Sequence, residues 1–206
     1  MLVPSHRPHV MFGLVGLAIS GGLLGMVLYG GNIRRSSLPL PNFGQLQDFS
    51  LMDHGGHPIS RTSLAGSVWI ADFIFTRCAG QCPMMSAQMA TLQQELKGLR
   101  GVRFVSFTVD PSYDTPERLA AYAAHYGANP ERWRFVTGEP SAIITLVQRG
   151  FRLAVGSDGT PQEPITHSVR LVLVDQRGSI RGYYDATDAR AMAQLKDDAR
   201  HLAQQH

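Results

Sequence analysis

The sequence predicts an α/β sandwich with a mixed central sheet, preceded by one N-terminal transmembrane helix. Short apolar runs rich in β-branched and aromatic residues alternate with longer segments whose apolar residues recur at helical spacing. The stretch 10–29 is uncharged and apolar or small, and as a helix it is long enough to span about 30 Å of hydrocarbon. Together these observations predict a membrane anchor followed by one globular domain.

Composition and charge narrow the class of protein. The chain has 206 residues, of which 44% are hydrophobic and 17% charged, as expected for one globular domain with a sizeable core. No acidic residue precedes Asp48, whereas three of the 19 basic residues do, so the remainder carries 16 basic and 16 acidic residues. The globular part is therefore formally neutral, which argues against a nucleic-acid-binding protein.

The N-terminal region divides into an anchor and a linker. Gly30 to Arg35 follow the apolar stretch and contain no Ala-x-Ala-like cleavage site, so the pattern favours an uncleaved anchor over a signal peptide. Basic residues flank the stretch on both sides, so their count does not decide its orientation. We predict a membrane anchor with its flanks at 1–35, a proline-containing linker at 36–44 and the globular domain at 45–206.

The first half of the domain contains a hairpin, two buried strands and a helix. The segment 47–60 reads as a β-hairpin that turns at His-Gly-Gly-His, and the apolar runs 67–75 and 102–109 read as buried strands. Between these strands, Pro83 suits the first turn of a helix that ends near Gly98. Its apolar residues recur at helical spacing: Met85, Met89, Leu92 and Leu96.

The second half begins with a helix that runs to about Tyr126. Asp114-Thr115-Pro116-Glu117 supplies a candidate N-cap, a proline just inside the helix and an acid in its first turn. The remaining predicted elements are strands at 133–136, 151–155, 169–175 and 179–184, and helices at 140–150 and 188–204. Trp69 and Trp133 fall in strands and are predicted to be core residues.

The order of these elements predicts the topology. The strand-to-strand connections that contain helices are long enough for parallel pairing, and the last two strands are close enough for an antiparallel pair. This is the thioredoxin-like arrangement, in which a pair of cysteines lies between a strand and the helix that follows it.

Cys78 and Cys82 are the only cysteines of the chain, and three residues separate them. At a helix N-terminus, unpaired backbone N–H groups and the helix dipole are expected to lower the pKa of both thiols. Such a pair can form a structural disulfide, a redox-cycling disulfide or a soft ligand pair for copper. A structural bridge is the weakest case, because closing so small a loop removes little chain entropy.

The spacing bears on the two remaining uses of the thiols. Thiol–disulfide oxidoreductases use Cys-x-x-Cys, whereas this loop has one more residue and contains Gly80, which lets it bulge. Two thiolates satisfy Cu(I), but Cu(II) also calls for an imidazole. His167 lies just ahead of the strand 169–175, in the loop that faces the dithiol in a thioredoxin-like fold, so it is the candidate third ligand. The alternative is a hydrogen-bonded structural histidine.

Several other residues have both a structural and a functional interpretation. His54 and His57 form either a polar hairpin tip or a metal pinch across the turn, and the polar tip is favoured. Met84, Met85 and Met89 offer thioethers to Cu(I) or fill the core, as methionine on an amphipathic helix usually does. Asp110 and Asp114 lie near the carboxyl end of a strand, where sites gather in α/β sheets, but a turn and a helix cap explain them equally well.

Three segments resemble the Sco/SenC family of membrane-tethered, thioredoxin-fold copper proteins that help to assemble the CuA centre of cytochrome c oxidase. They are DFIFTRCAGQCPMM, TVDPSYDTPERLAAY and THSVRLVLVD, and the resemblance extends from Gln45 to the closing helix. It implies that one copper ion per chain, as Cu(I) or Cu(II), binds to Cys78, Cys82 and His167. It also implies a single-pass protein of the bacterial inner membrane, with its soluble domain in the periplasm.

The family pattern is not matched everywhere. Many members have a proline after the first cysteine and an acid before the histidine, where this chain has Ala79 and Thr166. The charge near the copper is then less negative, which bears on docking to the partner. A periplasmic dithiol tends to oxidise, so copper loading presupposes a thiol reductant or a copper donor.

Two hypotheses about function follow. In the first, the protein is a copper metallochaperone that passes its ion to an oxidase subunit by ligand exchange. In the second, it is a thiol–disulfide oxidoreductase that reduces the cysteines of that subunit through a catalytic Cys78 and Cys82 pair. His167 discriminates between them, because thiol exchange needs only the two cysteines.

Overall fold

The structure is a computed structural model that describes residues 39–156 and 165–205. The predicted membrane helix and the rest of the segment 1–35 lie outside the described residues. Within the described ranges, no helix is both long enough and apolar enough to cross a membrane. Residues from Leu40 onward belong to one compact unit, which forms the globular domain described below.

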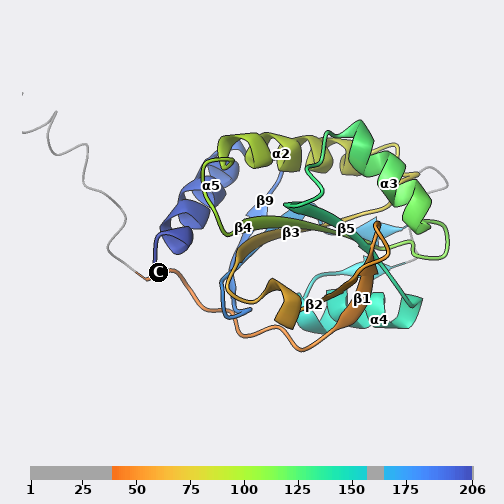
Figure 1. Cartoon of the computed structure of the whole chain (residues 1–206), viewed down its shortest axis with the longest axis horizontal. Helices are drawn as coiled ribbons and strands as arrows, with labels where there is room; N and C mark the ends of the chain where they lie inside the picture. Colours follow the sequence, from red (N-terminus) through yellow and green to blue (C-terminus); the bar gives the residue numbers. More distant parts are fainter. Residues whose placement is uncertain (1–38, 157–164, 206) are drawn as a thin grey trace, which may run out of the picture. The chain divides into compact units, whose positions relative to one another are not determined.

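A seven-stranded mixed sheet forms the centre of the domain (Figure 1), in the order β2-β1-β5-β4-β3-β8-β9. β3 pairs with β4 and β4 with β5 in parallel, whereas the other neighbours are antiparallel. The predicted thioredoxin-like sandwich with a mixed sheet is therefore confirmed. The strands are β1 (Ser50–Asp53), β2 (Pro58–Ser60), β3 (Val68–Ile74), β4 (Val102–Thr108), β5 (Trp133–Thr137), β8 (Arg170–Val174) and β9 (Ile180–Asp185).

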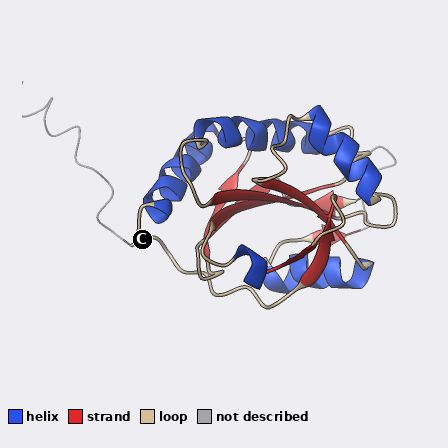
Figure 2. Ribbon diagram, in the orientation of Figure 1, coloured by secondary structure: helices blue, strands red, loops and turns tan. Residues whose placement is uncertain are grey.

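Helices cover both faces of this sheet (Figure 2). α2 (Gln81–Glu95), α3 (Pro116–His125) and α5 (Ala189–Ala203) lie on one face, and α4 (Pro140–Thr145) lies on the other. α4 continues into the π-helical turn η2 (Leu146–Gly150), and the short 3-10 helix η1 (Thr62–Leu64) precedes β3. Since α2 and α3 each connect two parallel strands, the carboxyl ends of β3 and β4 open at the same edge of the sheet.

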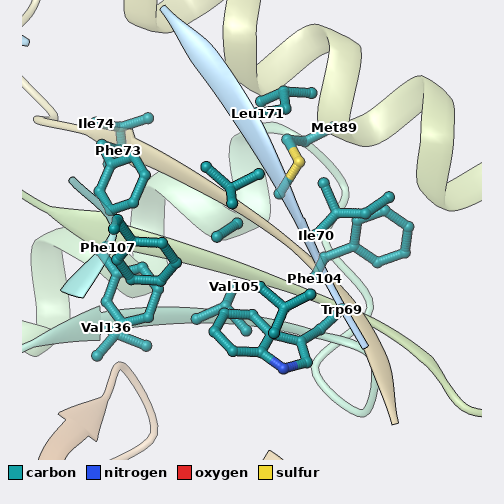
Figure 3. Close-up of a cluster of buried hydrophobic side chains, with 14 of the residues drawn as sticks. Trp69, Ile70, Phe73, Ile74, Met89, Phe104, Val105, Phe107, Val136 and Leu171 are labelled. Atoms are coloured by element: carbon teal, nitrogen blue, oxygen red, sulfur yellow. The ribbon is translucent and has the colours of Figure 1, made fainter. Parts of the chain in front are cut away.

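The core forms on both sides of β3, in which every residue is buried. On the α2 side, Met85, Met89 and Leu92 pack against the sheet at the predicted helical spacing. Figure 3 shows Met89 extending from α2 toward the strands. Trp69 is fully buried, as predicted, and stacks edge-on against Phe151, their ring centroids 6.0 Å apart.

The segment 151–155 is not the strand that the apolar pattern predicts. The N–H of Phe151 donates to the carbonyl of Leu146, and that of Leu153 donates to the carbonyl of Val147, so the end of the helix uses these donors. Arg152 has a positive φ of 56°, which breaks an extended run. Only β6 (Val155–Gly156) is extended, and it pairs with β7 (Thr166–His167).

Part of the expected linker packs on the edge strand β9. The N–H of Phe43 donates to the carbonyl of Ile180, and the Arg181 guanidinium donates to the carbonyls of Leu40 and Pro41. The Phe43 ring meets the ring of Tyr183 edge-on at 5.3 Å between centroids. These contacts cover part of an otherwise open sheet edge.

Candidate metal centre

The two cysteines lie where β3 gives way to α2, as predicted. Cys78 is in the connecting loop and Cys82 is the second residue of α2, and no disulfide joins these two residues. The N–H of Cys78 donates to the carbonyl of Phe75 at 3.2 Å, which folds the loop into a turn. The N-cap residue of α2 is Gly80, which offers no side chain to the unpaired N–H groups of the first turn.

Burial overrides the expected effect of the helix N-terminus at Cys82. Cys78 is 8% exposed, whereas Cys82 is fully buried. Desolvation raises the pKa of Cys82 above its ordinary value, and this outweighs the lowering by a hydrogen bond with the Phe75 backbone. The neighbouring Cys78 thiol raises this pKa further. The prediction of a lowered pKa is therefore wrong for Cys82, because a buried thiolate loses its hydration.

The backbone of His167 lies in the short strand β7. Its neighbour in the chain, β8, runs antiparallel to β3, with Ala71 opposite Val172. β8 therefore begins beside the end of β3 that leads to Cys78, and His167 lies three residues before β8. The topology thus brings the backbone of His167 to the same edge of the sheet as the dithiol.

Most of the alternative metal ligands have structural roles. The Nδ1 atom of His54 accepts the N–H of Phe135 at 3.2 Å, and the Nδ1 atom of His57 lies 3.3 Å from the Asp53 carboxylate, so the polar hairpin tip accounts for both histidines. Met85 and Met89 are fully buried core residues, and Met84 is partly buried against the same core. Among the side chains that the structure describes, no three of His, Cys, Asp or Glu gather as a metal site.

Asp114 is not the cap of α3. The N-cap is Thr115, whose Oγ1 atom accepts the N–H of Arg118 at 3.4 Å. Asp114 is instead fully buried, and its carboxylate accepts hydrogen bonds from the N–H and hydroxyl of Thr76 and from the hydroxyl of Thr108. Burial raises the pKa of Asp114, although these hydrogen bonds oppose the shift. Asp114, which the sequence pattern suggested as a helix cap, thus joins the loop after β4 to the loop that carries Cys78.

A second acid of the same loop holds the residue next to Cys78. The Nε atom of Arg77 donates to the Oδ2 atom of Asp110 at 2.7 Å. The guanidinium carbons of Arg77 and Arg118 lie 4.7 Å and 3.9 Å from the centroid of the Tyr113 ring, within the range of cation–π attraction. Asp110 and Asp114 therefore hold two consecutive residues, Thr76 and Arg77, directly before the first cysteine.

Sequence reasoning missed Asp72, a buried carboxyl in the middle of β3. It is fully buried, and neither of its carboxyl oxygens has a hydrogen-bond partner in the described part of the chain. Desolvation raises its pKa to about 7. Its charged form would also raise the pKa of Cys82. The available signal was an acid within the apolar run SVWIADFIF.

Comparison with known proteins places this chain in a family. The sequence matches the SCO1/SenC family model over residues 41–203. It is 34% identical, over 146 residues, to a SCO1 protein homolog of Bacillus subtilis, which covers 70% of this chain and 75% of the relative. It is 29% identical, over 152 residues, to a putative copper-binding protein of Stutzerimonas stutzeri, covering 72% of this chain and 73% of the relative.

A solved structure agrees with these matches. It is that of BsSco, described as a disulfide-switch protein and a member of the Sco family of cytochrome c oxidase assembly proteins. The two chains are 30% identical and superpose with a TM-score of 0.72, over 82% of this chain and 98% of BsSco. The match to the family model spans the hairpin, the dithiol and the closing helix. The chain therefore belongs to the SCO1/SenC family.

Proposed function

We propose that this protein is a copper metallochaperone that binds one copper ion through Cys78, Cys82 and His167. The observation that carries the proposal is the position of Cys78 and Cys82 between the end of β3 and the first turn of α2, at the edge to which β8 brings the backbone of His167. Two thiolates and an imidazole suit copper, because thiolates stabilise Cu(I) and the imidazole adds the ligand that Cu(II) prefers. The relative described as a putative copper-binding protein supports the choice of metal.

The buried thiol is compatible with copper as cargo. Cys82 carries its proton when no metal is bound, since burial raises its pKa. A copper ion displaces this proton and binds the resulting thiolate. The positive charge of the copper then compensates the negative charge of the buried thiolate. The site then holds a metal where solvent has little access, and Cys78, the more exposed thiol, is the ligand that a recipient reaches first.

The recipient in this proposal is a copper-accepting subunit of cytochrome c oxidase, whose CuA centre receives the ion by ligand exchange. The description of BsSco as an oxidase assembly protein supports this recipient. We further propose that the segment 1–35 anchors the protein in the bacterial inner membrane, with the globular domain in the periplasm. There the dithiol requires a thiol reductant or a copper donor to remain available.

The alternative, a thiol–disulfide oxidoreductase, uses the same cysteines differently. Thiol exchange begins with attack by a thiolate, and Cys82 is a poor attacker because it is fully buried with a raised pKa. In that reaction Cys78 would attack a disulfide of the partner and Cys82 would resolve the mixed disulfide. The relatives described as a putative copper-binding protein and as a cytochrome c oxidase assembly protein favour the metallochaperone.

Copper titration of the full chain, reduced and free of oxygen, tests the proposal. We expect a thiolate-to-Cu(II) charge-transfer band that saturates at one copper per chain and is lost in His167→Ala. The matched control is His57→Ala, at the hairpin tip, which should keep the band. Rapid oxidation to a disulfide without a band would instead favour the oxidoreductase, and an unchanged band in His167→Ala would remove His167 from the site.

A further inference from the structure

The side-chain contacts of Asp114 are not those of a turn residue or of a helix cap. Its side chain is fully buried between the loops that follow β3 and β4. Its Oδ2 atom lies 3.1 Å from the backbone nitrogen of Thr76, and its Oδ1 atom accepts the Thr76 hydroxyl. Thr76 is thus held at its backbone and at its side chain by a single carboxylate.

The other contacts of Asp114 make it rigid. The Thr108 hydroxyl, at the end of β4, donates to the Oδ2 atom of Asp114 and accepts the N–H of Asp110 at 3.0 Å. The backbone of Asp114 is held as well, since its N–H donates to the carbonyl of Asp110 and its carbonyl accepts the Thr137 hydroxyl at 3.3 Å. The carboxylate therefore has a fixed position relative to β4 and β5.

We propose that Asp114 is a positioning residue of the dithiol: it fixes Thr76, and through Thr76 the turn that sets Cys78 against Cys82. Thr76 is two residues before Cys78, and the N–H of Cys78 closes that turn on the carbonyl of Phe75. Without the carboxylate, the N–H and hydroxyl of Thr76 lose their partner, and a half-buried loop without its hydrogen bonds samples more conformations. The separation of the two sulfurs then varies more widely.

Two variants test this role at the two ends of the same contact. In Asp114→Asn, one carboxylate oxygen is replaced by an NH2 group, which cannot accept a hydrogen bond from Thr76 or Thr108. At least one of these hydrogen bonds is therefore lost. In Thr76→Val, the hydroxyl is removed and the shape of the side chain is kept, whereas Thr76→Ser restores the hydroxyl. Asp198→Asn is the matched control, because Asp198 is also a buried carboxylate and accepts the Tyr184 hydroxyl at 2.6 Å, between α5 and β9.

Two measurements on the full chain report the geometry of the thiols. The first is copper affinity with the position of the charge-transfer band, and it rests on the proposed function. The second is the equilibrium with glutathione disulfide, in which Cys78 and Cys82 form one disulfide and two glutathione thiols are released. This second measurement needs no copper.

We expect Asp114→Asn and Thr76→Val to weaken copper binding about tenfold, the lower end of the range for residues that orient metal ligands. Both variants should also shift the glutathione equilibrium toward the dithiol, because more mobile thiols meet less often. Thr76→Ser and Asp198→Asn should match the parent in both measurements. Thr76→Val keeps the test decisive if Asp114→Asn does not fold.

Other results would overturn the positioning role. Unchanged affinity and unchanged disulfide equilibrium in Asp114→Asn and Thr76→Val would show that the contact only stabilises the fold. Equal effects in Asp198→Asn would show a general loosening of the domain. If the parent protein binds no copper but the glutathione equilibrium still shifts in both variants, the metallochaperone proposal fails and the positioning role stands.

Discussion

Arg77, the residue directly before Cys78, forms an ion pair with Asp110, with 2.7 Å between the Nε atom of Arg77 and the Oδ2 atom of Asp110. The two side chains differ in solvent exposure, since that of Arg77 is 46% exposed and that of Asp110 only 10%. Water therefore screens the arginine far more than the carboxylate. The two residues connect the loop that carries Cys78 to the end of β4.

We predict that Arg77→Ala lowers the free energy of unfolding by about 1 kcal/mol or less, as is usual for an ion pair with one exposed partner. Chemical denaturation at neutral pH measures this effect, and high salt should reduce it. Arg61→Ala, which removes the surface pair with Asp48, is a comparable change far from the cysteines. A loss well above 2 kcal/mol would mean that Arg77 contributes more than its ion pair and its contact with the Tyr113 ring.

Asp72 should make the stability depend on pH. Its pKa is raised to about 7 in the folded state from an ordinary value of 3.8, so between these values the folded state binds more protons than the unfolded state. Stability from this group is therefore fully present below about pH 4 and is lost as the pH rises toward 7. Each pKa unit corresponds to about 1.4 kcal/mol.

The check is to compare Asp72→Asn with the parent by denaturation between pH 4 and pH 8. We expect the difference in unfolding free energy to shift in favour of the variant as the pH rises, because Asn cannot ionise. A difference that does not vary with pH would show that Asp72 titrates normally in the fold.

Met89 and Met84 should differ sharply in what they contribute to stability. Met89 is fully buried, so Met89→Ala leaves a cavity and should cost about 2 to 5 kcal/mol. Met84 is only partly buried, so Met84→Ala should cost less. Both variants should keep the copper stoichiometry of the parent. A lower stoichiometry in Met84→Ala alone would identify its thioether as a ligand.

Copper affinity should increase with pH. Since burial raises the pKa of Cys82, the proton occupies this thiol at neutral pH and copper must displace it. Titration with a competing chelator between pH 6 and pH 8 measures the effect, after correction for the chelator's own protonation. Equal affinity across this range would mean that no proton is released at Cys82.

Much of the fold follows from local sequence patterns. The hairpin at β1 and β2, the buried strand β3 and the amphipathic spacing of Met85 and Met89 were predicted because turn chemistry and periodicity act within a few residues. The position of the dithiol after β3 was predicted for the same reason. The prediction of a strand at 151–155 was wrong because an apolar residue such as Phe151 looks the same in the sequence whether it lies in a buried strand or in a core loop. In the fold, the Phe151 ring packs in an aromatic cluster with Trp69 and Phe73.

The sequence by itself determined the order of the main helices and strands apart from the segment 151–155, the thioredoxin-like topology and the candidate ligands Cys78, Cys82 and His167. Only the tertiary structure decided that Cys82 is a buried thiol with a raised pKa, that Asp114 binds Thr76 instead of capping α3, and that Asp72 is buried without a hydrogen-bond partner among the described residues. The reason is physical: desolvation and long-range hydrogen bonds depend on which distant segments pack around a group, whereas propensity and periodicity depend on its neighbours in the chain.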